Sequence, residues 1–144
     1  MWPLTEKKSM NDDEVLKKIL LTTKTIASVG LSGNPNKPSN GVAEYLMGHG
    51  YHVIPVNPTA DEILGEKSYP DLTSVPEEID VVQIFRRPED IPPIVDEAIK
   101  VSAKVIWMQE GIVNEEAAQT AREAGLQVVM DACMRATHRY LIGP

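Results

Sequence analysis

Residues 25–41 read TIASVGLSGNPNKPSNG, and this stretch decides the fold. Its first six residues are mostly small or β-branched, which predicts a buried strand that ends at Gly30. A loop rich in Gly, Pro and Asn follows and leads into residues 38–47, whose apolar side chains recur at helical spacing. A strand, a glycine-containing loop and a helix in this order are typical of the first unit of an α/β domain.

The same alternation continues to the end of the chain. Four further apolar runs predict strands, at 51–56, 80–85, 103–108 and 126–130. Amphipathic helices are expected to begin at Asn11 or Asp12, at Ile91 and at Asn114, and a short closing helix is expected in the tail 134–144. The strands are short and mostly lack alternation, so the sheet should be parallel and covered by helices on both faces.

These elements predict a Rossmann-like, doubly wound α/β fold with a five-stranded parallel sheet. Numbered along the chain, the strands are expected in the order 3-2-1-4-5, because crossover connections are right-handed. Residues 1–10 are expected to be a flexible leader, and residues 11–144 a single domain. Ligands of such sheets bind beyond the carboxyl ends of the strands, here near the boundary between strands 1 and 4.

The composition excludes several classes of function. A formal net charge of −7 argues against nucleic acid as a partner. The chain has no apolar run of transmembrane length and no signal peptide, so we expect a cytoplasmic protein without a membrane partner. The single cysteine and three histidines share no metal-ligand spacing, and no metal site is expected.

The loop after the first strand carries groups that suit a diphosphate. It offers close backbone approach at three glycines, hydrogen bonds from small polar side chains and one positive charge, and it precedes a helix N-terminus. The residues concerned are Gly30, Ser32, Gly33, Lys37, Ser39, Asn40 and Gly41. The alternative is an ordinary turn between a strand and a helix.

Three common nucleotide-binding and signalling patterns are absent. The loop is neither G-x-G-x-x-G nor G-x-x-x-x-G-K-[ST]. The second strand ends in Asn57-Pro58, where an NAD-binding fold would carry an acid. The third strand ends in Phe85-Arg86-Arg87 rather than the acid of a phosphoacceptor domain.

Taken together, the strand ends resemble a known family. They read GLS at 30–32, PVNP at 55–58, FRRP at 85–88, WMQEGI at 107–112 and DAC at 131–133. In order and spacing, this set resembles the small stand-alone CoA-binding proteins related to the N-terminal domain of the succinyl-CoA synthetase α subunit. The resemblance runs from about Asp13 to Tyr140, and it implies a Rossmann-like domain that binds coenzyme A.

The resemblance also implies a role for individual residues. The diphosphate would lie against Gly30, Ser32, Lys37, Asn40 and Gly41. The adenosine would lie by Val56, Asn57 and Pro58, and the pantetheine arm or a phosphate would meet Phe85 and Arg86. The pantetheine end would be bordered by Gln109, Glu110 and Gly111. The synthetase domain with the phosphorylated histidine has no counterpart here, so ligase chemistry is not implied.

Several alternatives stay open at this point. Arg86 could pair with Glu89 or Asp90 instead of a phosphate, and Cys133 is either a small buried hydrophobe or a thiol that forms a mixed disulfide with CoA. The expected function is binding of CoA or an acyl-CoA without self-contained catalysis, by a monomer or homodimer. The alternatives are an NAD(P)-dependent oxidoreductase, a CoA-ligase-like subunit that acts with a partner, and an interaction scaffold without a ligand.

Overall fold

The computed structural model describes residues 12–144, and it confirms the predicted α/β class. Residues 1–10, expected to be a flexible leader, and Asn11 lie outside the described residues. All strands of the main sheet run parallel, in the spatial order β2-β1-β5-β6-β7. Along the chain these strands are β1 (Thr25–Val29), β2 (His52–Val56), β5 (Val81–Ile84), β6 (Val105–Met108) and β7 (Gln127–Val129).

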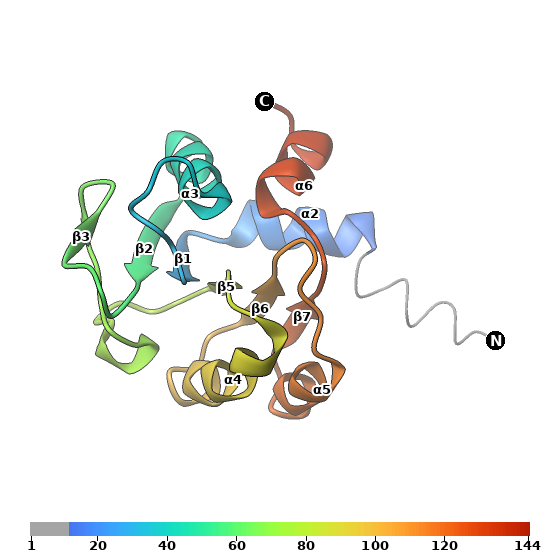
Figure 1. Ribbon diagram of the computed structural model, residues 1–144. Helices are drawn as coiled ribbons and strands as arrows, with labels where there is room; N and C mark the ends of the chain where they lie inside the picture. The colour runs from blue at the N-terminus through green and yellow to red at the C-terminus, as the bar shows by residue number, and fades with distance from the viewer. Residues whose placement is uncertain (1–11) are drawn as a thin grey trace.

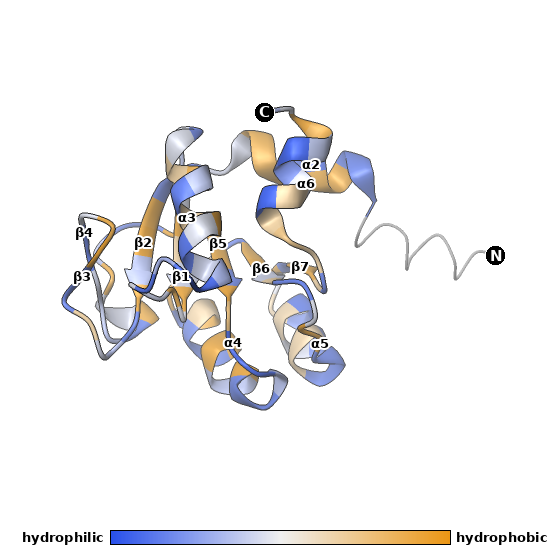
Figure 2. Ribbon diagram, turned by 45° about the horizontal axis from the view of Figure 1, so that its top comes forward, coloured by the Kyte–Doolittle hydropathy of each residue, from blue (hydrophilic) through white to orange (hydrophobic). Residues whose placement is uncertain are grey.

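Helices cover both faces of the sheet, as expected (Figure 1). The side chains of the sheet are accordingly buried in two hydrophobic clusters, one with α2, α3 and α6 and the other with α4 and α5. Figure 2 shows the apolar strands between helices whose outward faces are largely hydrophilic. The helices are α2 (Asp13–Thr22), α3 (Pro38–Gly48), α4 (Ile91–Lys100), α5 (Glu115–Glu123) and α6 (Met134–Leu141).

The capping residues and prolines at the helix N-termini explain where these helices begin. The Asp12 carboxylate accepts from the Glu14 N–H at 2.8 Å and caps α2, and the Asn114 side chain accepts from the Ala117 N–H at 2.9 Å and caps α5. Two prolines occupy the first turn of α4, where a missing N–H group costs little.

The predicted strand order 3-2-1-4-5 is wrong, because the third long strand does not join the outer edge of the second. β5 lies between β1 and β6, which gives the order 2-1-3-4-5 in the numbering of the prediction. The outer edge of β2 is occupied instead by Tyr69, whose N–H donates to Pro55 O at 3.1 Å and whose carbonyl accepts from Asn57 N at 2.8 Å. Asp80 fixes β5 beside β1, since its carboxylate accepts from the N–H groups of Lys24 and Thr25 at 2.9 and 3.0 Å.

The connection from β2 to β5, residues 57–80, is not α-helical. It forms a two-stranded hairpin of β3 (Glu62–Ile63) and β4 (Glu66–Lys67), followed by a 3₁₀ turn, η1 (Leu72–Ser74). Leu64 and Gly65 have φ angles of 53° and 80°, and a pair of positive φ angles is what a tight two-residue hairpin turn requires.

The corrected order moves the expected ligand crevice. α3, which follows β1, packs on one face of the sheet, and α4, which follows β5, packs on the other. The connections therefore diverge between β1 and β5, so the crevice lies there and not between the first and fourth strands.

Candidate functional site

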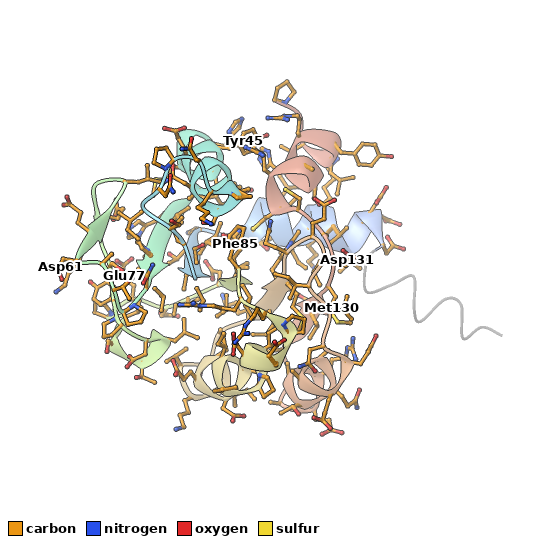
Figure 3. The ribbon with its side chains drawn as sticks, viewed as in Figure 1. Tyr45, Asp61, Glu77, Phe85, Met130 and Asp131 are labelled. Atoms are coloured by element: carbon orange, nitrogen blue, oxygen red, sulfur yellow. The ribbon has the colours of Figure 1, made fainter. Side chains whose placement is uncertain are left out.

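Gly30 lies at the centre of the crevice, where the chains leaving β1 and β5 are in close contact. Its φ is +90°, and a Cβ at this position would lie 2.6 Å from the Phe85 carbonyl oxygen. Its N–H donates to Val56 O at 3.0 Å. Figure 3 shows Phe85 near the middle of the molecule, among the side chains at this edge. Only glycine fits both the conformation and the space, so the first predicted site residue is required by the fold itself.

The loop after Gly30 is braced by its own polar side chains. The Ser32 N–H donates to Ser39 Oγ at 3.0 Å, and Asn40 Nδ2 donates to Ser32 O at 2.9 Å. The Ser32 hydroxyl in turn accepts from Asn34 N at 3.0 Å. Ser32 and Asn40, both predicted to contact a ligand, therefore hold the shape of the loop. The Gly33 N–H has no acceptor among residues 12–144, and this exposed residue is open to a ligand.

The loop ends at the N-terminus of α3, which no side chain caps. Lys37 stands at the N-cap position with its side chain exposed and forms no capping hydrogen bond. Of the three loop glycines, Gly30 has a positive φ, whereas Gly33 and Gly41 do not. A Cβ on Gly41 would lie 3.1 Å from Arg135 Nη1, so a second cation, from α6, lies against the first turns of α3.

Asn57, at the end of β2, ties two loops together. Its Nδ2 donates to Leu31 O at 3.0 Å, and its Oδ1 accepts from Thr59 N at 2.9 Å. With its N–H bonded to Tyr69 as well, Asn57 has a structural role beside the site. The position that would carry an acid in an NAD-binding fold is therefore occupied by an amide engaged in the protein's own bonds.

A cavity of about 370 Å³ opens between the ends of β1 and β2, the turn before η1 and helix α4. It brings together three of the predicted site residues, Val56, Pro58 and Arg86. Apolar groups from Val29, Pro70, Leu72 and Ile94 complete its walls, together with three carboxylates. The volume falls in the range of small-molecule sites, roughly 300–1,000 Å³.

The carboxylates of the cavity are Asp71, Asp90 and Glu97. The hydroxyls of Ser74 and then Thr73 donate to Asp71 and hold the pKa of its carboxyl below the usual value, so it is ionised at neutral pH. Glu97 accepts from the Leu72 N–H at 2.9 Å. A phosphate would be repelled by this group of charges, whereas a neutral base with an amino group could donate to it.

Arg86 and its neighbour Arg87 have different environments. Arg87 is exposed and pairs with Glu89 at 3.5 Å and Asp90 at 3.1 Å. Arg86 forms no ion pair or hydrogen bond with another residue in the range 12–144. Its Nε would lie 3.3 Å from a Cβ on Gly30, while the residue also lines the cavity. Its guanidinium group therefore lies between the cavity and the glycine loop.

At the end of β6, the predicted pantetheine-side residues are partly used by the protein. Gln109 is buried, and its Oε1 accepts from Met134 N at 3.0 Å and from Gln83 Nε2 at 3.3 Å. The Gly111 N–H donates to the Asp131 carboxylate at 2.6 Å. Glu110 is exposed and open to a ligand.

Cys133 is half-buried and packs against the hydrophobic cluster that includes α2, α3 and α6, and the two alternatives for its thiol stay open. His138 Nδ1 lies 2.8 Å from the Tyr45 hydroxyl. Within residues 12–144, no three His, Cys, Asp or Glu side chains are grouped to hold a metal ion. No helix of this range has the length and apolar character to span a bilayer.

Sequence reasoning missed the cavity walls beyond the strand ends. Pro70, Asp71 and Leu72 belong to the irregular β2–β5 connection, and Ile94 and Glu97 to one face of α4. The helical periodicity of α4 predicts the helix itself. Its position beside the crevice follows only from the corrected strand order. Arg135 was read as part of a closing tail.

Comparisons with known proteins identify the family. A family model described as "CoA binding domain" matches residues 24–139. The uncharacterized protein YneT of Bacillus subtilis is 44% identical over 123 residues, which cover 85% of this chain and 91% of YneT. The solved structure of a hypothetical protein from Pyrococcus horikoshii OT3 has a TM-score of 0.89 and 44% identity, and covers 91% of this chain and 92% of that one.

A more distant relation extends to CoA ligases. The ADP-forming acetate–CoA ligase II of Archaeoglobus fulgidus is 31% identical over 87 residues, which are 59% of this chain and only 13% of the ligase. The chain thus matches one part of a much longer enzyme. The match over residues 24–139 includes every strand of the sheet and both loops of the crevice. The chain belongs to the CoA binding domain family.

Proposed function

We propose that this protein binds coenzyme A, or an acyl-CoA, across the carboxyl ends of β2, β1 and β5. The observation that carries the proposal is the family match over residues 24–139 together with an unpaired Arg86 between a cavity and a glycine loop. CoA carries two bridging phosphates and a 3′-phosphate, so a cation without a protein partner in this place favours such a ligand.

The two sides of Arg86 suit different parts of the ligand. The cavity has apolar walls from Val56, Pro58 and Ile94 and carboxylates that can accept from an amino group, so we assign it to the adenine base of the adenosine end, with the 3′-phosphate held away from these carboxylates. The diphosphate would lie over the β1–α3 loop, where Gly30 permits close backbone approach and α3 presents its N-terminus. The pantetheine arm would then continue past Phe85 towards Glu110. We assign no chemical step to this site.

Ligand titration tests the proposal directly. CoA, acetyl-CoA and NADH are titrated into the full chain by calorimetry, with thermal melting as a second readout. We expect both CoA ligands to bind and to raise the melting temperature, and NADH to do neither. NADH binding with no response to CoA would favour the oxidoreductase alternative, and no response to any of the three would contradict a CoA site.

Neighbouring arginines provide a matched test of the site. Arg86→Gln should weaken CoA binding about tenfold or more, because a charge-assisted hydrogen bond to phosphate is lost. Arg87→Gln removes the same charge one residue away and should leave the affinity within twofold. Equal losses in both variants would mean that only the general charge of this segment matters, and Arg86 would then not be a ligand.

A further inference from the structure

Arg135 lies at the Gly41 end of the glycine loop, whereas Arg86 lies at its Gly30 end. It belongs to α6, far from the loop in sequence, but its Nη1 would lie 3.1 Å from a Cβ on Gly41. Gly41 is the fourth residue of α3, a helix whose N-terminus lacks a side-chain cap. The Arg135 guanidinium is therefore held close to the end of α3 that attracts anions.

The backbone that carries Arg135 is fixed on both sides. The preceding residue, Met134, donates its N–H to the buried Gln109 side chain at 3.0 Å. One turn later, His138 Nδ1 lies 2.8 Å from the Tyr45 hydroxyl of α3, and His138 itself is buried. With α6 attached at these two points, the placement of Arg135 against α3 follows from the packing and not from a mobile tail.

Arg135 also has no acceptor of its own. Between residues 12 and 144 it forms no ion pair or side-chain hydrogen bond, and the nearest acid along α3, Glu44, does not pair with it. The chain has a formal net charge of −7, yet within the described residues Lys37, Arg86 and Arg135, from three different elements, leave their charges unpaired around one loop. Such a concentration of free cations in an acidic protein favours an anionic ligand.

We infer that Arg135 binds the diphosphate of CoA, so that the C-terminal helix forms one wall of the ligand site. This inference rests on the proposed function. The diphosphate is chosen over the 3′-phosphate because Gly41 lies on the α3 face of the sheet, whereas the adenosine end is assigned to the cavity beside α4. A guanidinium can contact two phosphate oxygens at once, which suits a diphosphate better than a single point charge would.

The test compares Arg135→Gln with Arg139→Gln, a matched control on the same helix. Arg139 is exposed and its guanidinium lies over the Tyr45 ring, 5.1 Å from the centroid. CoA and dephospho-CoA, which keeps the diphosphate but lacks the 3′-phosphate, are titrated into each variant. Arg135→Gln should weaken both ligands about tenfold or more and to the same extent, and Arg139→Gln should change neither by more than twofold.

Each other outcome has a definite meaning. A loss confined to CoA would assign Arg135 to the 3′-phosphate and overturn the inference, and so would equal losses in the two variants. If wild type binds CoA and Arg135→Gln binds it equally well, the inference fails while the proposed function stands. If wild type binds neither ligand, the proposed function itself fails. Melting without ligand verifies that each variant is folded.

A double-mutant cycle of Gly41→Ala and Arg135→Gln tests whether CoA affinity depends on the position of the Arg135 guanidinium. Gly41→Ala places a methyl group 3.1 Å from Nη1, so the flexible end of Arg135 must move. We expect this substitution to weaken CoA binding a few-fold in wild type and to have no further effect in Arg135→Gln, because the group it displaces is gone. Additive losses would show that Gly41 acts on the ligand by itself, and this coupling to Arg135 would be disproved.

Discussion

The two halves of the carboxyl edge of the sheet use their polar groups differently. Among the described residues, the half formed by the ends of β2, β1 and β5 leaves the side chains of Lys37 and Arg86 and the Gly33 N–H without protein partners. The half formed by the ends of β6 and β7 uses most of its polar groups internally, with Gln109 bonded to Met134 and Asp131 to Gly111, and leaves Glu110 exposed. Under the proposed function the first half would hold the ligand, while the second fixes α6 through the bond from Met134 N to Gln109.

Because of this difference, we expect stability and ligand binding to depend on different residues. A substitution in the β6–β7 half should mainly lower the free energy of unfolding. It should lower CoA affinity only because the site is then less stably folded. A substitution at the charged positions of the β2–β1–β5 half should mainly lower CoA affinity and change the free energy of unfolding little. Gly30 is the exception, because it belongs to the ligand half and is also required by packing.

The largest effect is expected for Gly30→Ala. An alanine there adopts an unfavourable φ of +90° and brings its Cβ to 2.6 Å from the Phe85 carbonyl oxygen, so backbone must shift. We expect the free energy of unfolding to fall by about 3 kcal/mol and CoA binding to be lost. Urea denaturation measures the first quantity and calorimetry the second.

Gly50→Ala is the matched control for that change. Gly50 has a similar φ of +94°, but nothing lies within 4 Å of the added Cβ. Its cost should therefore be backbone strain alone, about 1 kcal/mol, with CoA affinity unchanged. Equal costs at the two glycines would show that the contact between the β1 and β5 loops contributes nothing to stability.

Gln109→Leu should have the next largest effect. Leucine leaves the Met134 N–H without its acceptor and the buried Gln83 amide with only the weak acceptor Met134 Sδ at 3.6 Å, which should cost about 2 kcal/mol of unfolding free energy. The exposed Gln127 of β7 is the control, and Gln127→Leu should be close to neutral. Gln109 was predicted to border the pantetheine end. A loss of CoA affinity without a comparable loss of stability would support that role and contradict the division described above.

The sequence predicted the class of the fold and only part of its topology. Apolar runs and turn residues are local signals, so every long strand was found. The position of β5 depends on Tyr69 occupying the outer edge of β2 and on Asp80 binding the start of β1, and no periodicity reports contacts of this kind.

The candidate site was predictable to a similar degree. The strand ends were found because parallel strands share a carboxyl edge. Ser32 and Asn40 were assigned to a ligand, although both bond within the loop, because a sequence does not say which acceptor a donor meets. The cavity wall from Pro70 and Ile94 needed the strand order, and Arg135 needed the packing of α6 on α3.

A smaller, pH-dependent effect is expected from His138. This residue of α6 contacts Tyr45 of α3 and so connects the helices of the two halves. Burial, and then the nearby His49, lower the pKa of His138 below its ordinary value of about 6.5. The unfolded chain then binds a proton more readily than the folded one, so this contribution to stability is complete above about pH 6.5 and is lost as the pH falls below it. Melting temperatures between pH 7.5 and 5.5 should decline less in His138→Gln than in wild type. Parallel declines would assign the pH dependence to other groups.

The smallest effect is expected for Arg87→Gln, because this side chain lies at the border of the ligand half but already has partners. Its ion pairs with Glu89 and Asp90 are solvent-exposed, and such pairs contribute little to stability. The melting temperature should therefore stay the same at low and high salt, and CoA affinity should stay within twofold. A clear loss of affinity would mean that a phosphate displaces Asp90 from Arg87 when CoA binds. The boundary of the ligand half would then extend one residue beyond Arg86.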